Sequence, residues 1–163
     1  MKTLHNILLL GALCSFFFIS CSSSDEDKLT KKGPDFAISD LQGTWNATSA
    51  VFSPGDPGSQ ANPVDIIAED GSLTMAIQSN GRFTMTFNVP DVDIEPVTGE
   101  MFFENNEFFA IRFDDEPGDY DYFGATLTST TFEVISAEPV ADWDFDEDGN
   151  EEPAYVSLNL VRT

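Results

Sequence analysis

The sequence predicts an all-β protein, an eight-stranded antiparallel up-and-down barrel, on three observations. From Leu41 onward, apolar and polar residues alternate with a period of two, as in a strand with one buried face. Turn residues separate the alternating segments at short spacing. No stretch of a dozen residues has a helical period. A two-sheet β-sandwich fits the same pattern and is the alternative.

The first half of the predicted domain contains four strands. They cover residues 41–52, 72–79, 82–89 and 98–104, and a long loop rich in proline and glycine separates the first two. Asn80-Gly81 supplies the residues that a type I′ hairpin requires, because both of its turn positions have positive φ. Pro90 ends the third strand, since proline cannot donate to a strand ladder. The segment 64–69 is suited to a turn of helix.

The second half contains four more strands, over residues 107–113, 121–128, 131–137 and 154–162. Eight sequential strands leave two open edges unless the sheet closes, and closure into a barrel removes both edges. The interior of such a barrel is either filled by side chains or left as one small cavity.

Two motifs at the ends of the domain resemble those of the lipocalin family. Gly43-Thr44-Trp45, with Leu41 before it, resembles the Gly-x-Trp opening of the first strand in that family. Residues 158–162 resemble its closing strand, which ends in arginine. The resemblance implies that Arg162 packs over Trp45, a cation–π pair worth roughly 0.5–2 kcal/mol. Both residues are structural in the family, so the resemblance implies a lipocalin-like fold and not a function.

Residues 1–20 are predicted to be a signal peptide. Lys2 precedes an apolar run over residues 7–19, which is too short to span a ~30 Å hydrocarbon core. Ser20-Cys21 after this run resembles the lipobox of bacterial lipoproteins, in which the cysteine carries lipid and becomes the new N-terminus. The resemblance implies lipidation of Cys21, with fatty acids such as palmitate, and stable anchoring requires more than one acyl chain. An ordinary secretory signal, with Cys21 a free thiol, is the alternative.

The next segment, residues 21–38, is predicted to be a lipidated flexible tether, and residues 39–163 the barrel domain. Residues 22–27 resemble the serine-plus-acidic export signal of Bacteroidetes lipoproteins. The resemblance implies an outer-membrane protein displayed on the cell surface. Retention on the periplasmic face is the alternative, because any stretch of this composition makes a solvated tether.

The charge and the missing residue types exclude several functions. The chain has 29 acidic and 7 basic residues, a formal net charge of −22, which repels nucleic acid phosphates. Its one histidine, His5, lies in the predicted signal peptide, and Cys14 is removed with it. Without histidine or a usable thiol, Ser-His-Asp and Cys-His catalysis and His-ligated zinc sites are excluded. We therefore expect a monomer that binds no nucleic acid, catalyses no reaction and holds no cofactor other than, in one loop, calcium.

That loop carries the one local cluster of metal-binding residue types. Asp144, Asp146 and Asp148, followed by Gly149, resemble the Asp-x-Asp-x-Asp-Gly start of EF-hand-type calcium loops. The twelfth position holds Tyr155 in place of the usual bidentate glutamate. A solvated acidic hairpin is the simpler interpretation. A calcium site is the alternative, with the ligands Asp144, Asp146, Asp148, Asn150 and Glu152.

The leading functional hypothesis is a binding module that holds a small apolar molecule in the mouth of the barrel. Its expected lining consists of Phe83, Met85, Phe87, Met101, Phe103 and Phe108. The rival hypothesis is that these side chains fill the core. The chain would then be a structural or interaction lipoprotein whose loops contact a protein or a glycan.

Overall fold

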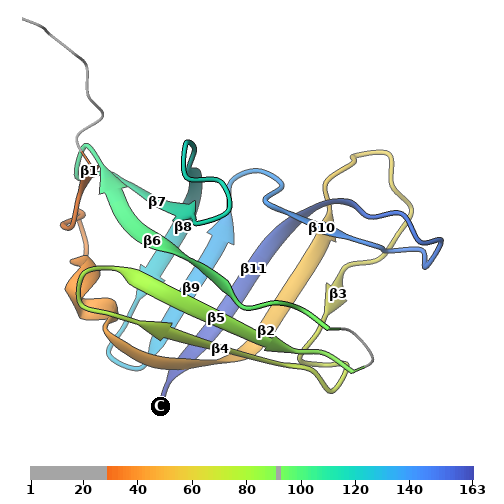
Figure 1. Ribbon diagram of the computed structural model, residues 1–163, viewed down its shortest axis with the longest axis horizontal. Helices are drawn as coiled ribbons and strands as arrows, with labels where there is room; N and C mark the ends of the chain where they lie inside the picture. Colours follow the sequence, from red (N-terminus) through yellow and green to blue (C-terminus); the bar gives the residue numbers. More distant parts are fainter. Residues whose placement is uncertain (1–28, 91–92) are drawn as a thin grey trace, which may run out of the picture.

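The computed structural model describes residues 29–90 and 93–163, and within them the chain forms a closed antiparallel barrel (Figure 1). Each strand of the ring pairs with the next in the chain, and β11 pairs with β2 to close it. The ring confirms the predicted eight-stranded, lipocalin-like barrel and excludes the open sandwich. Its strands are β2 (Gly43–Pro54), β4 (Ser72–Ile77), β5 (Arg82–Asn88), β6 (Val97–Glu104), β7 (Phe108–Phe113), β8 (Asp121–Leu127), β9 (Thr131–Ser136) and β11 (Glu152–Arg162).

Short elements are added to this ring. Strand β1 (Leu29–Thr30) pairs with β6, β3 (Val64–Asp65) with β2, and β10 (Ala141–Trp143) with β11. A 3-10 helix, η1 (Ile38–Leu41), precedes β2. Residues 64–65 are therefore a strand, and the turn of helix that the sequence allowed there does not form. In Figure 1, β1 lies at one end of the barrel, and β3 and β10 lie toward the other.

The hairpin turns correct one prediction. Asn80 does not have a positive φ, and only Gly81 does, at 88°. The turn spans Gln78 to Arg82, whose backbone groups hydrogen-bond at 2.8 Å, so it is a longer loop that ends in a left-handed glycine. The two adjacent positive φ angles of a type I′ turn occur instead at Asn105 (53°) and Asn106 (61°), between β6 and β7.

Residues 29–38 are packed against the barrel, although the sequence placed them in a flexible tether. Ile38 of η1 is fully buried. The centroid of the Phe36 ring lies 5.2 Å from that of Phe103. The backbones of Lys32 and Ala37 form an isolated antiparallel β-bridge. Apolar residues in a short polar segment were enough to cover one barrel end, here called the closed end. The predicted signal peptide, Cys21 and the rest of the tether through residue 28 lie outside the described residues.

Trp45 and Arg162 make the contact that the lipocalin resemblance implies. Trp45 is fully buried, and the Arg162 guanidinium lies 4.2 Å from its ring centroid. The Trp45 indole N–H donates to the Leu41 carbonyl at 2.8 Å. Arg162 also donates to the carbonyls of Asp40, at 2.7 Å, and of Gln42. One side chain therefore joins the last strand to η1 and to the first strand of the ring.

We predict that Arg162→Ala lowers the free energy of unfolding by about 2 kcal/mol, because it removes a cation–π contact and two charge-assisted hydrogen bonds. Urea unfolding of residues 22–163, followed by tryptophan fluorescence, measures the loss. Arg112→Ala is the matched control: Arg112 lies 5.2 Å from the Phe102 ring centroid on the outer face, without carbonyl partners among the described residues. Equal losses in the two variants would contradict the role given to Arg162.

Candidate functional site

An apolar cavity of about 120 Å³ occupies the barrel interior on the side away from η1. The alternation of the strands places its lining, since every second residue of a strand faces inward. Phe83, Met85 and Phe87 line it from β5, as the sequence predicted. The other lining residues are also apolar: Phe52, Met75, Val97, Ile111, Phe113, Phe123, Val134, Val140, Ala141, Val156 and Leu158.

The other residues predicted to line the cavity lie elsewhere. Met101 and Phe103 are buried in the core and do not border the cavity. Phe103 packs instead against Phe36 and Phe109 at the closed end, with ring centroids 5.2 and 5.5 Å away. Phe108 is 51% exposed, because Phe109 and Ile111 take the inward positions of β7. The prediction placed β7 one residue out of phase. The sequence signal that could have corrected it is the alternating apolar series Phe109, Ile111 and Phe113.

The cavity reaches the surface at the mouth, which we define as the barrel end opposite η1. Phe87, Val97, Val140 and Ala141 are only half-buried there. Strand β10 borders this opening beside β11, and its Trp143 ring stacks on that of Phe52 at 4.7 Å. Sequence analysis missed β10 as a wall of the site, because three residues are too few to show a strand period.

A second, wider hollow adjoins the cavity at the mouth. It shares four wall residues with the cavity: Val97, Phe113, Val140 and Ala141. Its other walls include Asp115 and Glu116 of the β7–β8 loop, Asp121 at the start of β8, and Asp142 of β10. We call this hollow the acidic vestibule. An apolar cavity therefore opens beside a surface lined by carboxylates.

Asp121 is the vestibule carboxylate most enclosed by protein. It lies two residues before Phe123, which lines the cavity, so both share the inward face of β8. Partial burial raises the pKa of Asp121, and the nearby carboxylates of Glu138, Glu116 and Asp119 raise it further. Its carboxylate has no hydrogen-bond or ion-pair partner among the described residues. The charge of this group is uncompensated at the place where the apolar cavity meets the vestibule.

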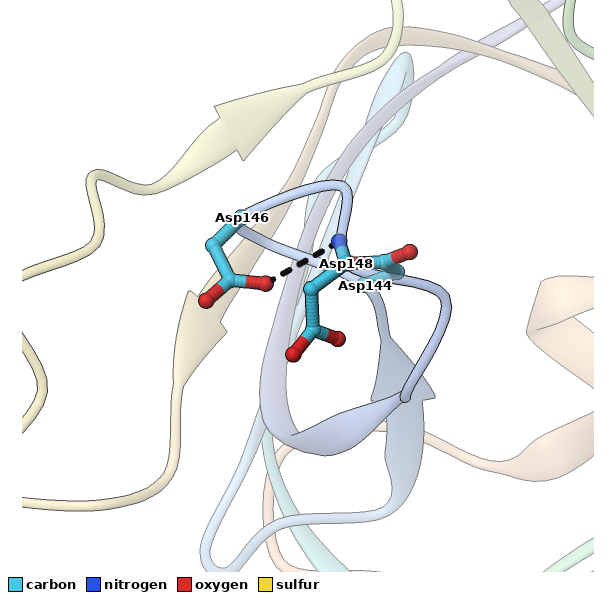
Figure 2. A group of neighbouring side chains, drawn as sticks. All are labelled: Asp144, Asp146 and Asp148. Carbon is cyan, nitrogen blue, oxygen red and sulfur yellow. Dashed lines mark hydrogen bonds between the residues drawn. The ribbon is translucent and has the colours of Figure 1, made fainter.

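The acidic loop between β10 and β11 brings three of its predicted ligands together (Figure 2). Carboxylate oxygens of Asp144, Asp146 and Asp148 lie within 4.8 Å of one another. The Asp148 amide donates to Asp144 and Asp146, each at 3.2 Å, and the Asn150 amide donates to Asp148 at 2.8 Å, so backbone groups already hold all three carboxylates. Three converging carboxylates can bind one hard cation. When no cation is bound, the backbone amides can supply their hydrogen bonds.

The other two predicted ligands have different partners. The Glu152 carboxylate accepts a hydrogen bond from the Phe145 amide at 3.0 Å and is not among the converging oxygens. The Asn150 side chain bonds to Asp148 at 2.8 Å. Three of the four predicted carboxylate ligands therefore converge, and Asn150 hydrogen-bonds to one of the three.

Comparisons with protein-family models, with curated proteins and with solved structures found no match to this chain. Within residues 29–90 and 93–163, no helix is long and apolar enough to cross a membrane. The fold and the site themselves define the class of protein: a closed antiparallel β-barrel with a small apolar cavity at one end.

If the three aspartates hold a calcium ion, calcium relieves their mutual repulsion and raises Tm. Linkage makes the gain grow with concentration, about 2.7 kcal/mol at 100 times Kd. Without a bidentate glutamate we expect a Kd of ~10⁻⁴–10⁻³ M. Differential scanning fluorimetry measures the shift, with magnesium and sodium at matched ionic strength as controls for screening.

The double variant Asp146→Asn with Asp148→Asn is expected to lose the calcium-specific part of this shift. The control variant, Glu147→Gln with Glu151→Gln, removes the same charge from the same loop outside the cluster. It should retain the calcium-specific shift in Tm. An equal shift with magnesium, or none with calcium, would show that the loop is only a solvated acidic turn.

Proposed function

We propose that the chain is a lipid-anchored protein of the outer membrane, displayed at the cell surface, whose barrel binds a small apolar molecule without catalysing a reaction. The apolar cavity at the mouth is the observation that carries the binding function. Proteins bind small molecules in concave, mostly apolar sites, and the mouth of a barrel is a usual place for them. The anchoring part rests on the lipobox resemblance at Cys21, outside the described residues.

The size of the cavity limits the ligand. At about 120 Å³ it is close to the engineered apolar cavity of about 150 Å³ that takes up benzene. One ring or a short alkyl chain fits inside. A long fatty acid does not fit unless most of it remains outside the cavity.

The rival hypothesis of a filled barrel describes only one half of the interior. At the closed end, the rings of Phe36, Phe109 and Phe132 pack against one another in the interior, with centroids no more than 6.5 Å apart. At the mouth, the walls are equally apolar but the space between them is not filled. This difference between the two halves favours a binding function over a purely structural one.

The described chain enters the barrel at the closed end, opposite the mouth. The described chain begins at Leu29, whose strand β1 pairs with β6 at the closed end (Figure 1). The eight residues from Cys21 to Leu29 reach at most about 30 Å. Lipid on Cys21 would therefore hold the closed end near the membrane and leave the mouth accessible from the other side.

Benzene tests the cavity directly. We predict that it shifts the methyl NMR signals of Met75, Met85 and Val134 in residues 22–163, a chain that contains the complete ring of strands. Ala141→Phe places a ring in the mouth and should abolish the shifts. Ala76→Phe is the matched control, because Ala76 is exposed on β4 and does not line the cavity. No benzene-dependent shift in the wild type would favour the filled-barrel hypothesis.

Lipidation is tested in the cell with the full chain. We predict that Cys21→Ala abolishes labelling by a palmitate analogue and releases the protein from the membrane fraction. Cys14→Ala, in the predicted signal peptide, should leave both unchanged. Protease treatment of intact cells then reports display, since a surface protein is cleaved and a periplasm-facing one is protected. Normal membrane fractionation of Cys21→Ala would contradict the anchor.

A further inference from the structure

The carboxylates of the acidic vestibule lie beside the apolar cavity and indicate the charge of its ligand. We propose that the barrel selects amphiphilic cations, with the apolar group in the cavity and an ammonium group in the acidic vestibule beside Asp121. This inference rests on the proposed binding function and adds the charge of the ligand.

The geometry supplies both halves of such a site next to each other. The cavity and the vestibule share Val97, Phe113, Val140 and Ala141, so a ligand of a few atoms beyond one ring contacts both. Asp121 and Phe123 lie two residues apart on the inward face of β8. A polar group attached to a ring that contacts Phe123 can therefore reach the vestibule wall that contains Asp121.

No basic side chain of residues 29–90 and 93–163 neutralises the mouth. Among the described residues, no basic side chain lines the cavity or the vestibule. Arg82 is paired with Asp114 at 2.6 Å, and Arg112 lies over the Phe102 ring. Arg162 is bound to carbonyls at the closed end, where Lys31 donates to the Met101 carbonyl at 2.9 Å. The vestibule carboxylates keep their full attraction for an external positive charge.

A metal ion is a poorer occupant of the vestibule than an organic cation. Within the described part of the chain, the carboxylates that converge closely enough to share an ion are Asp144, Asp146 and Asp148, none of which lines the vestibule. Separated carboxylates around an apolar opening suit a single ammonium group, which needs no tight ring of oxygens and brings its own apolar part. An anionic amphiphile, in contrast, would place its charge beside carboxylates.

Three ligands that share one ring and differ in charge provide the test: benzylammonium, benzyl alcohol and benzoate. We measure Kd for residues 22–163 by NMR titration at low ionic strength. Benzylammonium is expected to bind roughly tenfold more tightly than benzyl alcohol, the scale of a charge-assisted hydrogen bond, and benzoate more weakly than both. Asp121→Asn should reduce this preference for the cation to within about threefold.

The control separates a local site from the field of an acidic protein. Glu133→Gln removes one charge from the exposed outer face of β9, away from the vestibule, and should keep the tenfold preference. Equal affinities for benzylammonium and benzyl alcohol would overturn the proposal and leave the apolar binding function intact. An equal loss of preference in Glu133→Gln and Asp121→Asn would also overturn it. If benzene itself does not bind, the proposed function fails first, and this inference fails with it.

Discussion

The pairing of the last strand with the first is the constraint on which the rest of the structure depends. It runs from Ala154 opposite Pro54 to Arg162 opposite Trp45, with one irregularity between Asn159 and Leu160. Closure leaves neither strand with an open edge and brings Arg162 over Trp45. Because the same guanidinium holds the carbonyls that flank the end of η1, closing the ring also covers one end of the barrel. The apolar cavity lies toward the opposite end.

The ring could be predicted from the sequence because period-two alternation is a local signal. The eight main strands fall where the alternation placed them. The errors arose where the deciding interaction is not local. Phe36 and Ile38 sit in a segment of tether-like composition, and only the open end of the finished barrel gives them a surface to bury against. The phase of β7 is an exception, because the apolar series Phe109, Ile111 and Phe113 already indicates in the sequence which face of the strand is buried.

The site was harder to predict than the fold, for the same reason. Strand β5 supplied correct lining residues because its pattern of Phe83, Met85 and Phe87 has one phase and no competing apolar neighbour. The vestibule has no sequence motif at all. Glu116, Asp121 and Asp142 come from a loop and two strands, and only barrel closure brings them to one opening. In a chain with 29 acidic residues, no pattern marks these carboxylates as different from the rest. The aspartate loop could be found because its residues are adjacent in sequence, although Glu152 bonds to the Phe145 amide and does not join the three converging carboxylates.

The two ends of the barrel differ in charge. Lys31, Lys32 and Arg162 belong to the closed end, whereas the carboxylates at the mouth have no basic side chain beside them among the described residues. A low-dielectric cavity beside carboxylates of one sign concentrates cations and repels anions at its opening. Apolar burial supplies affinity but discriminates poorly between rings and chains of similar size, since each methylene contributes only about 0.8 kcal/mol. Selectivity then depends on the rim, where an anionic amphiphile meets like charge. In the proposed binding function, the cavity walls would therefore set the size of the ligand, and the carboxylates at the mouth would set its charge.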